Sequence, residues 1–185
     1  VQQTLVKALN HPEEWKSGWI ELYEMMAKDF LYADPYNLVV FPDNHDISRM
    51  YTQLNEDREL LQLALAFTLT TRGIPQIYYG TEILMSNKGT TDHGIIRSDF
   101  PGGWAGDEVN AFSGNGLSEE QKEVKAWLQK LLNWRKSASA VHRGRLVHFL
   151  PRNGLYVYFR FDEQQKVMVV LNKNENDTPL GLDRF

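Results

Sequence analysis

The sequence contains no cysteine among its 185 residues. Disulfides, thiolate metal sites and thiol nucleophiles are therefore excluded, because each requires a cysteine sulfur. Long hydrophobic runs are also lacking: the longest apolar stretch lies around Leu63 to Leu69 and is broken by threonine at and after Thr68. A bilayer-spanning helix needs roughly 20 apolar residues, so we expect no membrane span.

A basic stripe is absent as well. The chain has 20 Lys and Arg against 24 Asp and Glu, which gives a net charge of −4, and the two signs are interspersed. Neutralising a phosphate backbone requires clustered positive charge, so we expect no nucleic-acid partner and favour an uncharged ligand. The first residues, Val1 to Thr4, include neither an initiator Met nor a signal-peptide pattern, and we expect the chain to begin inside a longer protein.

Two strand-and-helix units are predicted in the first half of the chain. Apolar residues at intervals of three and four predict an amphipathic helix from His11 to about Tyr32, and the continuous apolar run Leu38 to Phe41 predicts a strand buried on both faces. A second helix fits Asp57 to Thr71, and Pro75 opens a second short apolar segment. This alternation indicates βα units around a parallel sheet, with functional loops at 42–56 and 80–116.

A third helix and an antiparallel unit are predicted in the second half. Ser118 starts the helix in a capping-box-like pattern, and the helix continues to a basic end at Arg135 and Lys136. From residue 142 the apolar period becomes two, in runs at 146–150, 155–161 and 167–171. Turn residues separate these runs, which predicts an antiparallel meander.

The polar segment Asp43-Asn44-His45-Asp46 follows directly after the first predicted strand. One interpretation is structural: Asn and Asp side chains commonly cap the next backbone turn. The other is functional, because barrel enzymes place catalytic residues at the carboxyl ends of their strands. The position of His45 between two polar neighbours favours the functional interpretation.

The pattern Phe41-x-x-Asn44-His45-Asp46 resembles the last short motif of the alpha-amylase superfamily, glycoside hydrolase family 13. Residues 73–82 resemble the next strand segment of the same family. The resemblance implies an α/β fold: the last two strands and helices of a (β/α)8 barrel at 1–141, followed by the start of a small, truncated antiparallel β domain at 142–185. It also implies a parent of the alpha-amylase, neopullulanase or cyclomaltodextrinase type.

The resemblance also suggests roles for individual residues. It implies that Asp46 stabilises the transition state and that His45 contacts hydroxyl groups of the same sugar of an alpha-linked glucan. Asn44 is placed in the substrate-binding set, although we favour a role in orienting the turn. Arg49 is placed in that set too, and for Arg49 we favour a structural role beside the acidic cluster.

Three further residues have competing interpretations. Trp104 lies in a segment that resembles a cleft variant of maltodextrin- and pullulan-degrading members, where it would either stack on a sugar or pin the loop to the barrel. Glu82 is interpreted as a structural carboxylate at the barrel rim, because the acid of the family lies on another strand. His93 has no second ligand at zinc spacing, so no metal site is assigned.

The two carboxylates of a retaining glycosidase have no motif in this sequence. In the family they lie on the fourth and fifth strands, and a complete barrel needs about 250 residues. We therefore expect the nucleophile and the general acid to lie outside the chain, in an enzymatic parent, and the isolated chain to be inactive. The alternatives are a non-catalytic carbohydrate-binding or scaffolding module, and a transglycosylase or isomerase of alpha-glucans.

The remaining expectations concern cofactors, location and assembly. No cofactor is expected within these residues, whereas the resemblance allows calcium in the full-length parent. A polysaccharide-degrading parent favours the periplasm or the extracellular space, with the cytoplasm as the alternative. A partial barrel leaves strand edges unpaired, so we expect the isolated chain to self-associate.

Overall fold

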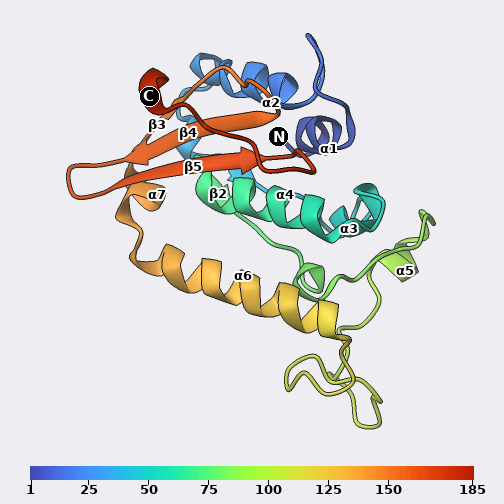
Figure 1. The fold of residues 1–185 in the computed structure, drawn as a ribbon. Helices are drawn as coiled ribbons and strands as arrows, with labels where there is room; N and C mark the ends of the chain where they lie inside the picture. The colour runs from blue at the N-terminus through green and yellow to red at the C-terminus, as the bar shows by residue number, and fades with distance from the viewer.

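The computed structural model describes every residue from 1 to 185 (Figure 1). The helices are α1 (Gln2–Asn10), α2 (Trp19–Met26), α3 (Met50–Gln53), α4 (Arg58–Thr70), α5 (His93–Ile96), α6 (Glu119–Ser137) and α7 (Ser139–Arg143). The strands are β1 (Val39–Val40), β2 (Ile74–Pro75), β3 (Arg145–His148), β4 (Leu155–Phe161) and β5 (Lys166–Asn172). In Figure 1, α4 lies between the three-stranded sheet and the long helix α6. None of these helices combines the length and the apolar character that crossing a bilayer requires.

Strands β1 and β2 form a parallel pair, as the alternation of strands and helices predicts. Val39 is opposite Ile74 and Val40 is opposite Pro75. Val40 is buried, but Val39 is 53% exposed, so the predicted burial on both faces is wrong for this residue. The cause is the size of the sheet: β1 pairs with β2 alone, and in a strand successive side chains point to opposite faces.

The predicted helix from His11 to Tyr32 is wrong in extent. Only α2 is an α-helix within this range. Trp15 and Phe30, which belong to the apolar pattern that predicted the longer helix, are 88% and 81% exposed. The helix begins late because Gly18 takes a positive φ of 77°, which breaks any helix arriving from residue 11. The carboxylate of Glu13 then accepts the Trp19 N–H at 3.0 Å and so satisfies the start of α2.

The two other predicted helices are confirmed, and side-chain caps define where each begins. The Asp57 carboxylate accepts the Leu60 N–H at 2.9 Å at the start of α4. At the start of α6, Ser118 and Gln121 exchange side-chain and backbone hydrogen bonds in a capping box. Each cap satisfies backbone donors that the first helical turn leaves free.

The antiparallel meander is also confirmed, in the order β3-β4-β5. The β3–β4 connection ends in the turn that the sequence indicated, with positive φ at both Asn153 and Gly154. Positive φ at two consecutive residues gives the twist that a tight hairpin needs.

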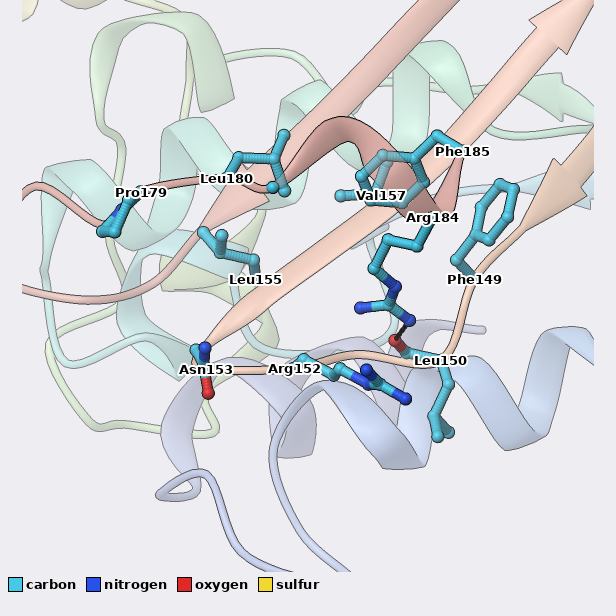
Figure 2. A pocket seen from close by; sticks show the side chains of 11 residues that line it. Phe149, Leu150, Arg152, Asn153, Leu155, Val157, Pro179, Leu180, Arg184 and Phe185 are labelled. Atoms are coloured by element: carbon cyan, nitrogen blue, oxygen red, sulfur yellow. Dashed lines mark hydrogen bonds between the residues drawn. The ribbon is translucent and has the colours of Figure 1, made fainter.

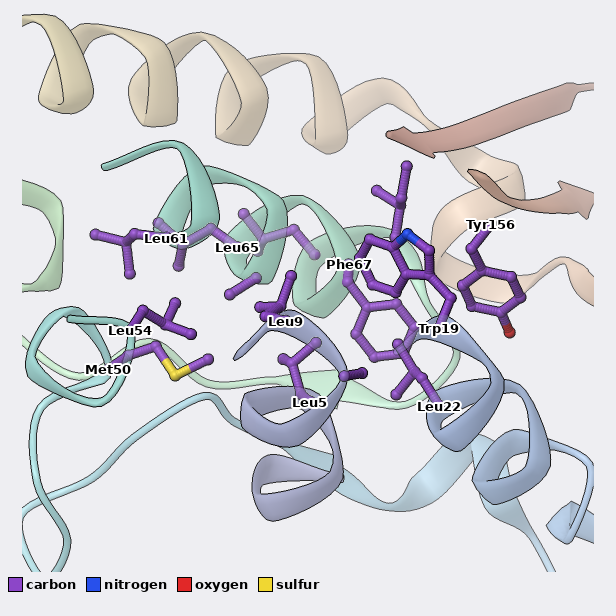
Figure 3. Close-up of a cluster of buried hydrophobic side chains, with 14 of the residues drawn as sticks. Leu5, Leu9, Trp19, Leu22, Met50, Leu54, Leu61, Leu65, Phe67 and Tyr156 are labelled. Carbon is purple, nitrogen blue, oxygen red and sulfur yellow. The ribbon is translucent and has the colours of Figure 1, made fainter. Parts of the chain in front are cut away.

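One hydrophobic core joins the helices to this sheet (Figure 3). Leu5, Leu22 and Leu61 lie in it together with Tyr156 on β4, and all four are buried. The indole N–H of Trp19 donates to the Gly154 carbonyl at 2.9 Å, a contact between residues far apart in the chain. The boundary between residues 141 and 142 stays a prediction, and the core extends across it.

Candidate functional site

The candidate site is built on the turn that follows β1. The side-chain oxygen of Asn44 accepts the Asp46 N–H at 2.9 Å, which is the Asx turn of the structural interpretation. The turn leaves the side chains of His45 and Asp46 on the surface, 60% and 61% exposed. His45 Nε2 lies 3.3 Å from Asp46 Oδ2. Asn44 thus shapes a turn that presents an imidazole and a carboxylate side by side.

Arg97 completes this exposed group, and sequence reasoning missed it. Its Nη2 donates to Asp46 Oδ1 at 3.0 Å, and its Nε donates to the His45 carbonyl at 3.0 Å. The same Nη2 lies 3.1 Å from His93 Nδ1. The sequence offered no signal for this contact, because Arg97 is 51 positions from Asp46 in a loop without periodicity.

Asp43 lies behind the turn and is completely buried. Its Oδ2 accepts the Met50 N–H at 2.8 Å, and the Thr81 hydroxyl lies 3.3 Å from the same oxygen. Burial raises the pKa of Asp43 to about 6, while the Met50 hydrogen bond and the positive charge of Arg49 oppose the shift. Asp43 therefore fixes the loop from inside and is not available to a ligand.

Arg49 is equally buried and holds three segments together. Its Nε donates to the Ile96 carbonyl at 3.0 Å, its Nη1 donates to the Tyr79 carbonyl, and its guanidinium lies 4.4 Å from the centre of the Tyr78 ring. With no surface exposed, Arg49 is placed to tie loops rather than to contact a sugar. This position agrees with the structural role that the sequence favoured.

Neither Trp104 nor Glu82, which were also singled out in the sequence, forms a hydrogen bond or ion pair with His45 or Asp46. Trp104 is 68% exposed, and its indole N–H donates to Asp99 at 3.0 Å, so its stacking on a sugar stays a prediction. Glu82 lies in the short 3-10 helix Thr81–Ile83, where its charge adds to the raised pKa of Asp43. Nowhere in the chain do three His, Asp or Glu side chains gather into a group that could hold a metal ion.

The pocket in Figure 2 is separate from this site. It lies between the β3–β4 connection and the C-terminal segment 179–185, and Phe149, Arg152 and Phe185 are among its lining residues. Arg184 crosses it to donate to the Leu150 carbonyl at 2.9 Å. None of the residues that the sequence predicted for the site lines this pocket.

Comparison with known proteins identifies the family. Residues 2–140 match the profile described as "Alpha amylase, catalytic domain", and residues 146–185 match "Cyclo-malto-dextrinase C-terminal domain". The cyclomaltodextrin glucanotransferase of Bacillus sp. (strain 38-2) is 35% identical over 151 residues, which cover 82% of this chain and 18% of that protein. The chain therefore spans about a fifth of the length of the curated relatives it matches.

Solved structures agree on the fold. The gamma-CGTase of alkalophilic Bacillus clarkii is 29% identical with a TM-score of 0.60, over 85% of this chain and 21% of that one. An alpha-amylase from Geobacillus thermoleovorans, solved with acarbose, has a TM-score of 0.70 at 23% identity, over 93% of this chain and 35% of the other. Strands β1 and β2 with their helices are thus part of a (β/α)8 barrel, followed by an antiparallel sheet. The chain belongs to the alpha-amylase family.

Proposed function

We propose that this chain supplies the substrate-holding end of the active site of an enzyme that acts on alpha-linked glucans. Asp46 stabilises the transition state through hydrogen bonds to the sugar at the point of cleavage, and His45 binds hydroxyl groups of the same sugar. The observation that carries the proposal is the pairing of these two side chains, exposed at the carboxyl end of a barrel strand.

The chemistry explains why an ionised, positioned carboxylate is useful there. Glycoside cleavage passes through an oxocarbenium-like transition state, in which hydrogen bonds to ring hydroxyls strengthen and contribute several kcal/mol. A carboxylate whose hydrogen bonds to the sugar strengthen only in the transition state raises kcat. A carboxylate that binds substrate and transition state equally well lowers KM alone. Asp46 acts as such a stabiliser and transfers no proton.

The bond-breaking carboxylates belong, in this proposal, to residues outside the chain. A retaining glycosidase holds a nucleophile and a general acid roughly 5–5.5 Å apart across the scissile bond. The side chains that contact Asp46 are an arginine and a histidine rather than a second carboxylate. Asp43 is close in sequence but buried.

The direct test is Asp46→Asn in the protein that carries this chain together with the two carboxylates. We expect kcat on maltooligosaccharides to fall by roughly 10²-fold or more, as for removal of other transition-state donors and acceptors. Because Asp46 is exposed, the melting temperature should stay unchanged. A turnover close to that of the unchanged protein would rule out the role.

A second experiment separates an enzyme from a non-catalytic module. The chain alone, incubated with maltooligosaccharides, should release no reducing sugar, because it retains only the stabilising carboxylate. Release of sugar that Glu82→Gln abolishes would show that Glu82 is an acid and that the proposal assigns the acid wrongly.

Transfer rather than hydrolysis is the second candidate. It is favoured by the 35% identity to a protein named a glucanotransferase, while the profile matched at 146–185 carries the name of a cyclomaltodextrinase. The products decide between the two: a transferase forms longer or cyclic oligosaccharides from maltohexaose, and a hydrolase forms shorter linear ones alone.

A further inference from the structure

We propose that Arg97 is a positioning residue for Asp46, fixing the direction of its carboxylate for the sugar. The inference rests on the proposed function of Asp46 and adds a residue that the motif 41–46 does not contain. Arg97 lies in the loop after α5 and reaches across to the turn after β1.

The geometry is that of a clamp on two consecutive residues. Nε of Arg97 holds the carbonyl of His45, and Nη2 holds Oδ1 of Asp46, both at 3.0 Å. A guanidinium presents its donors in a rigid planar fork, so two anchors fix backbone and side chain together. The other oxygen, Oδ2, lies 3.3 Å from His45 Nε2.

The clamp leaves acceptor capacity on Asp46. An ionised carboxylate offers about four lone-pair sites, and Arg97 and His45 approach one oxygen each. The side chain of Asp46 is 61% exposed, so the remaining sites are open to a ligand. Hydroxyl donors of a sugar can bind these sites without displacing Arg97.

Arg97 is itself held from both sides along the backbone. The carbonyl before it, of Ile96, accepts the buried Arg49 Nε at 3.0 Å. The carbonyl after it, of Ser98, accepts the Tyr79 hydroxyl at 2.9 Å. The buried arginine therefore fixes the position of the exposed one, and an accidental surface pair would not have these two anchors.

His93 supports the guanidinium from behind. Arg97 can only donate, so in the 3.1 Å contact from its Nη2 the His93 Nδ1 atom is the acceptor. The side chains of Arg97 and Asp46 are 46% and 61% exposed. Exposed ion pairs contribute little to stability, so holding the fold together does not explain this arrangement.

The test measures kcat and KM on maltooligosaccharides for Arg97→Ala, in the longer protein that also carries the two carboxylates. We expect kcat to fall about tenfold or more with KM changed by less than about threefold, because a misdirected carboxylate costs transition-state binding first. Arg97→Lys should recover part of the loss, since it retains one donor and the charge. Arg143→Ala, at an exposed arginine at the end of α7 whose side chain forms no hydrogen bond or ion pair, is the matched control and should change neither constant.

A double-mutant cycle decides whether Arg97 acts through Asp46. In the Asp46→Asn background, Arg97→Ala should lower kcat by less than about twofold, because the effects of two residues that act as one unit are not additive. Added guanidinium ion should restore several-fold activity to Arg97→Ala when Asp46 is present, and none in Asp46→Asn. Melting temperatures of all variants exclude a loss of fold as the cause.

The outcomes separate the two proposals. If Asp46→Asn leaves kcat unchanged, the proposed function fails. If Asp46→Asn lowers kcat but Arg97→Ala costs the same in both backgrounds, or guanidinium rescues neither, the positioning role is overturned and the role of Asp46 remains. Non-additive losses with rescue confined to Asp46 support both.

Discussion

Two groups of ionisable side chains lie within seven residues of each other and occupy opposite environments. Asp43 and Arg49 are completely buried, whereas His45 and Asp46 between them are mostly exposed. The buried group forms hydrogen bonds to backbone atoms of the surrounding loops, although Nη2 of Arg49 has no partner. The exposed group keeps hydrogen-bonding capacity free for a ligand. One short segment therefore contains both the support of the site and the surface that would bind the sugar.

The physical difference between the groups determines what each can do. A buried charge is costly unless it is paired and hydrogen-bonded, so it is retained where it fixes geometry. An exposed charge costs little to keep ionised and contributes little to the fold. Changes in the first group should therefore affect stability, and changes in the second should affect catalysis.

The largest effect is expected for Arg49→Ala. Removing this side chain leaves the Ile96 and Tyr79 carbonyls without donors and takes a positive charge from beside Asp43. We expect the free energy of unfolding, measured by urea denaturation, to fall by about 3–5 kcal/mol. Arg49→Lys keeps the charge but not the planar set of guanidinium donors, and it should lower the free energy of unfolding by less. A loss below about 1 kcal/mol for the alanine variant would show that the buried Arg49 does not support the fold.

The next effect is a pH dependence that Asp43 confers. Burial raises the pKa of Asp43 to about 6 in the folded protein, above its ordinary value of 3.8, so the folded state binds the proton more tightly than the unfolded state. Protonation of Asp43 therefore increases the free energy of unfolding as the pH falls from about 6 to about 4, and this contribution is lost as the pH rises again. A difference of about two pKa units corresponds to about 3 kcal/mol.

Asp43→Asn supplies the matched control, because it keeps an acceptor for the Met50 N–H but does not titrate. The unfolding free energy of the unchanged protein, relative to that of the variant, should rise by this amount between pH 7 and pH 4. If the unfolding free energies of the two proteins changed with pH in parallel, burial would not disfavour the ionised form of Asp43.

The smallest effect is expected for His45→Ala, in the exposed group. The imidazole contacts a sugar hydroxyl in both the bound substrate and the transition state, so its loss should mainly raise KM, by about tenfold. Stability should change by less than about 0.5 kcal/mol, since the ring is exposed. A large loss of stability with unchanged KM would place His45 with the buried group.

Local signals in the sequence were enough to predict several features. The apolar spacing at 57–71 and the capping pattern at Ser118 marked two helices, and the turn at Asn153 and Gly154 marked the meander, because each depends on neighbours a few residues away. The polar turn at 43–46 was found by its position after an apolar run. Its individual roles stay predictions.

Features that depend on distant partners could not be predicted in the same way. The clamp of Arg97 on Asp46 joins residues 51 positions apart, and the burial of Asp43 depends on how the loops at Thr81 and Met50 fold over it. The helix predicted from residue 11 failed for a different reason. Its apolar residues recur at helical spacing, but the positive φ of Gly18 interrupts the chain, and Trp15 and Phe30, on either side of α2, are exposed.

The hydrogen bond from Trp19 to the Gly154 carbonyl has a consequence for synthesis on the ribosome. The two residues are 135 positions apart, and Tyr156, Tyr158 and Leu171 complete the core around the early helices. At roughly 5–20 residues per second, the nascent helices wait for many seconds before the last strand emerges. During that interval their apolar faces remain open to water, so chaperones that shield such surfaces should associate with the nascent chain until β5 has left the exit tunnel.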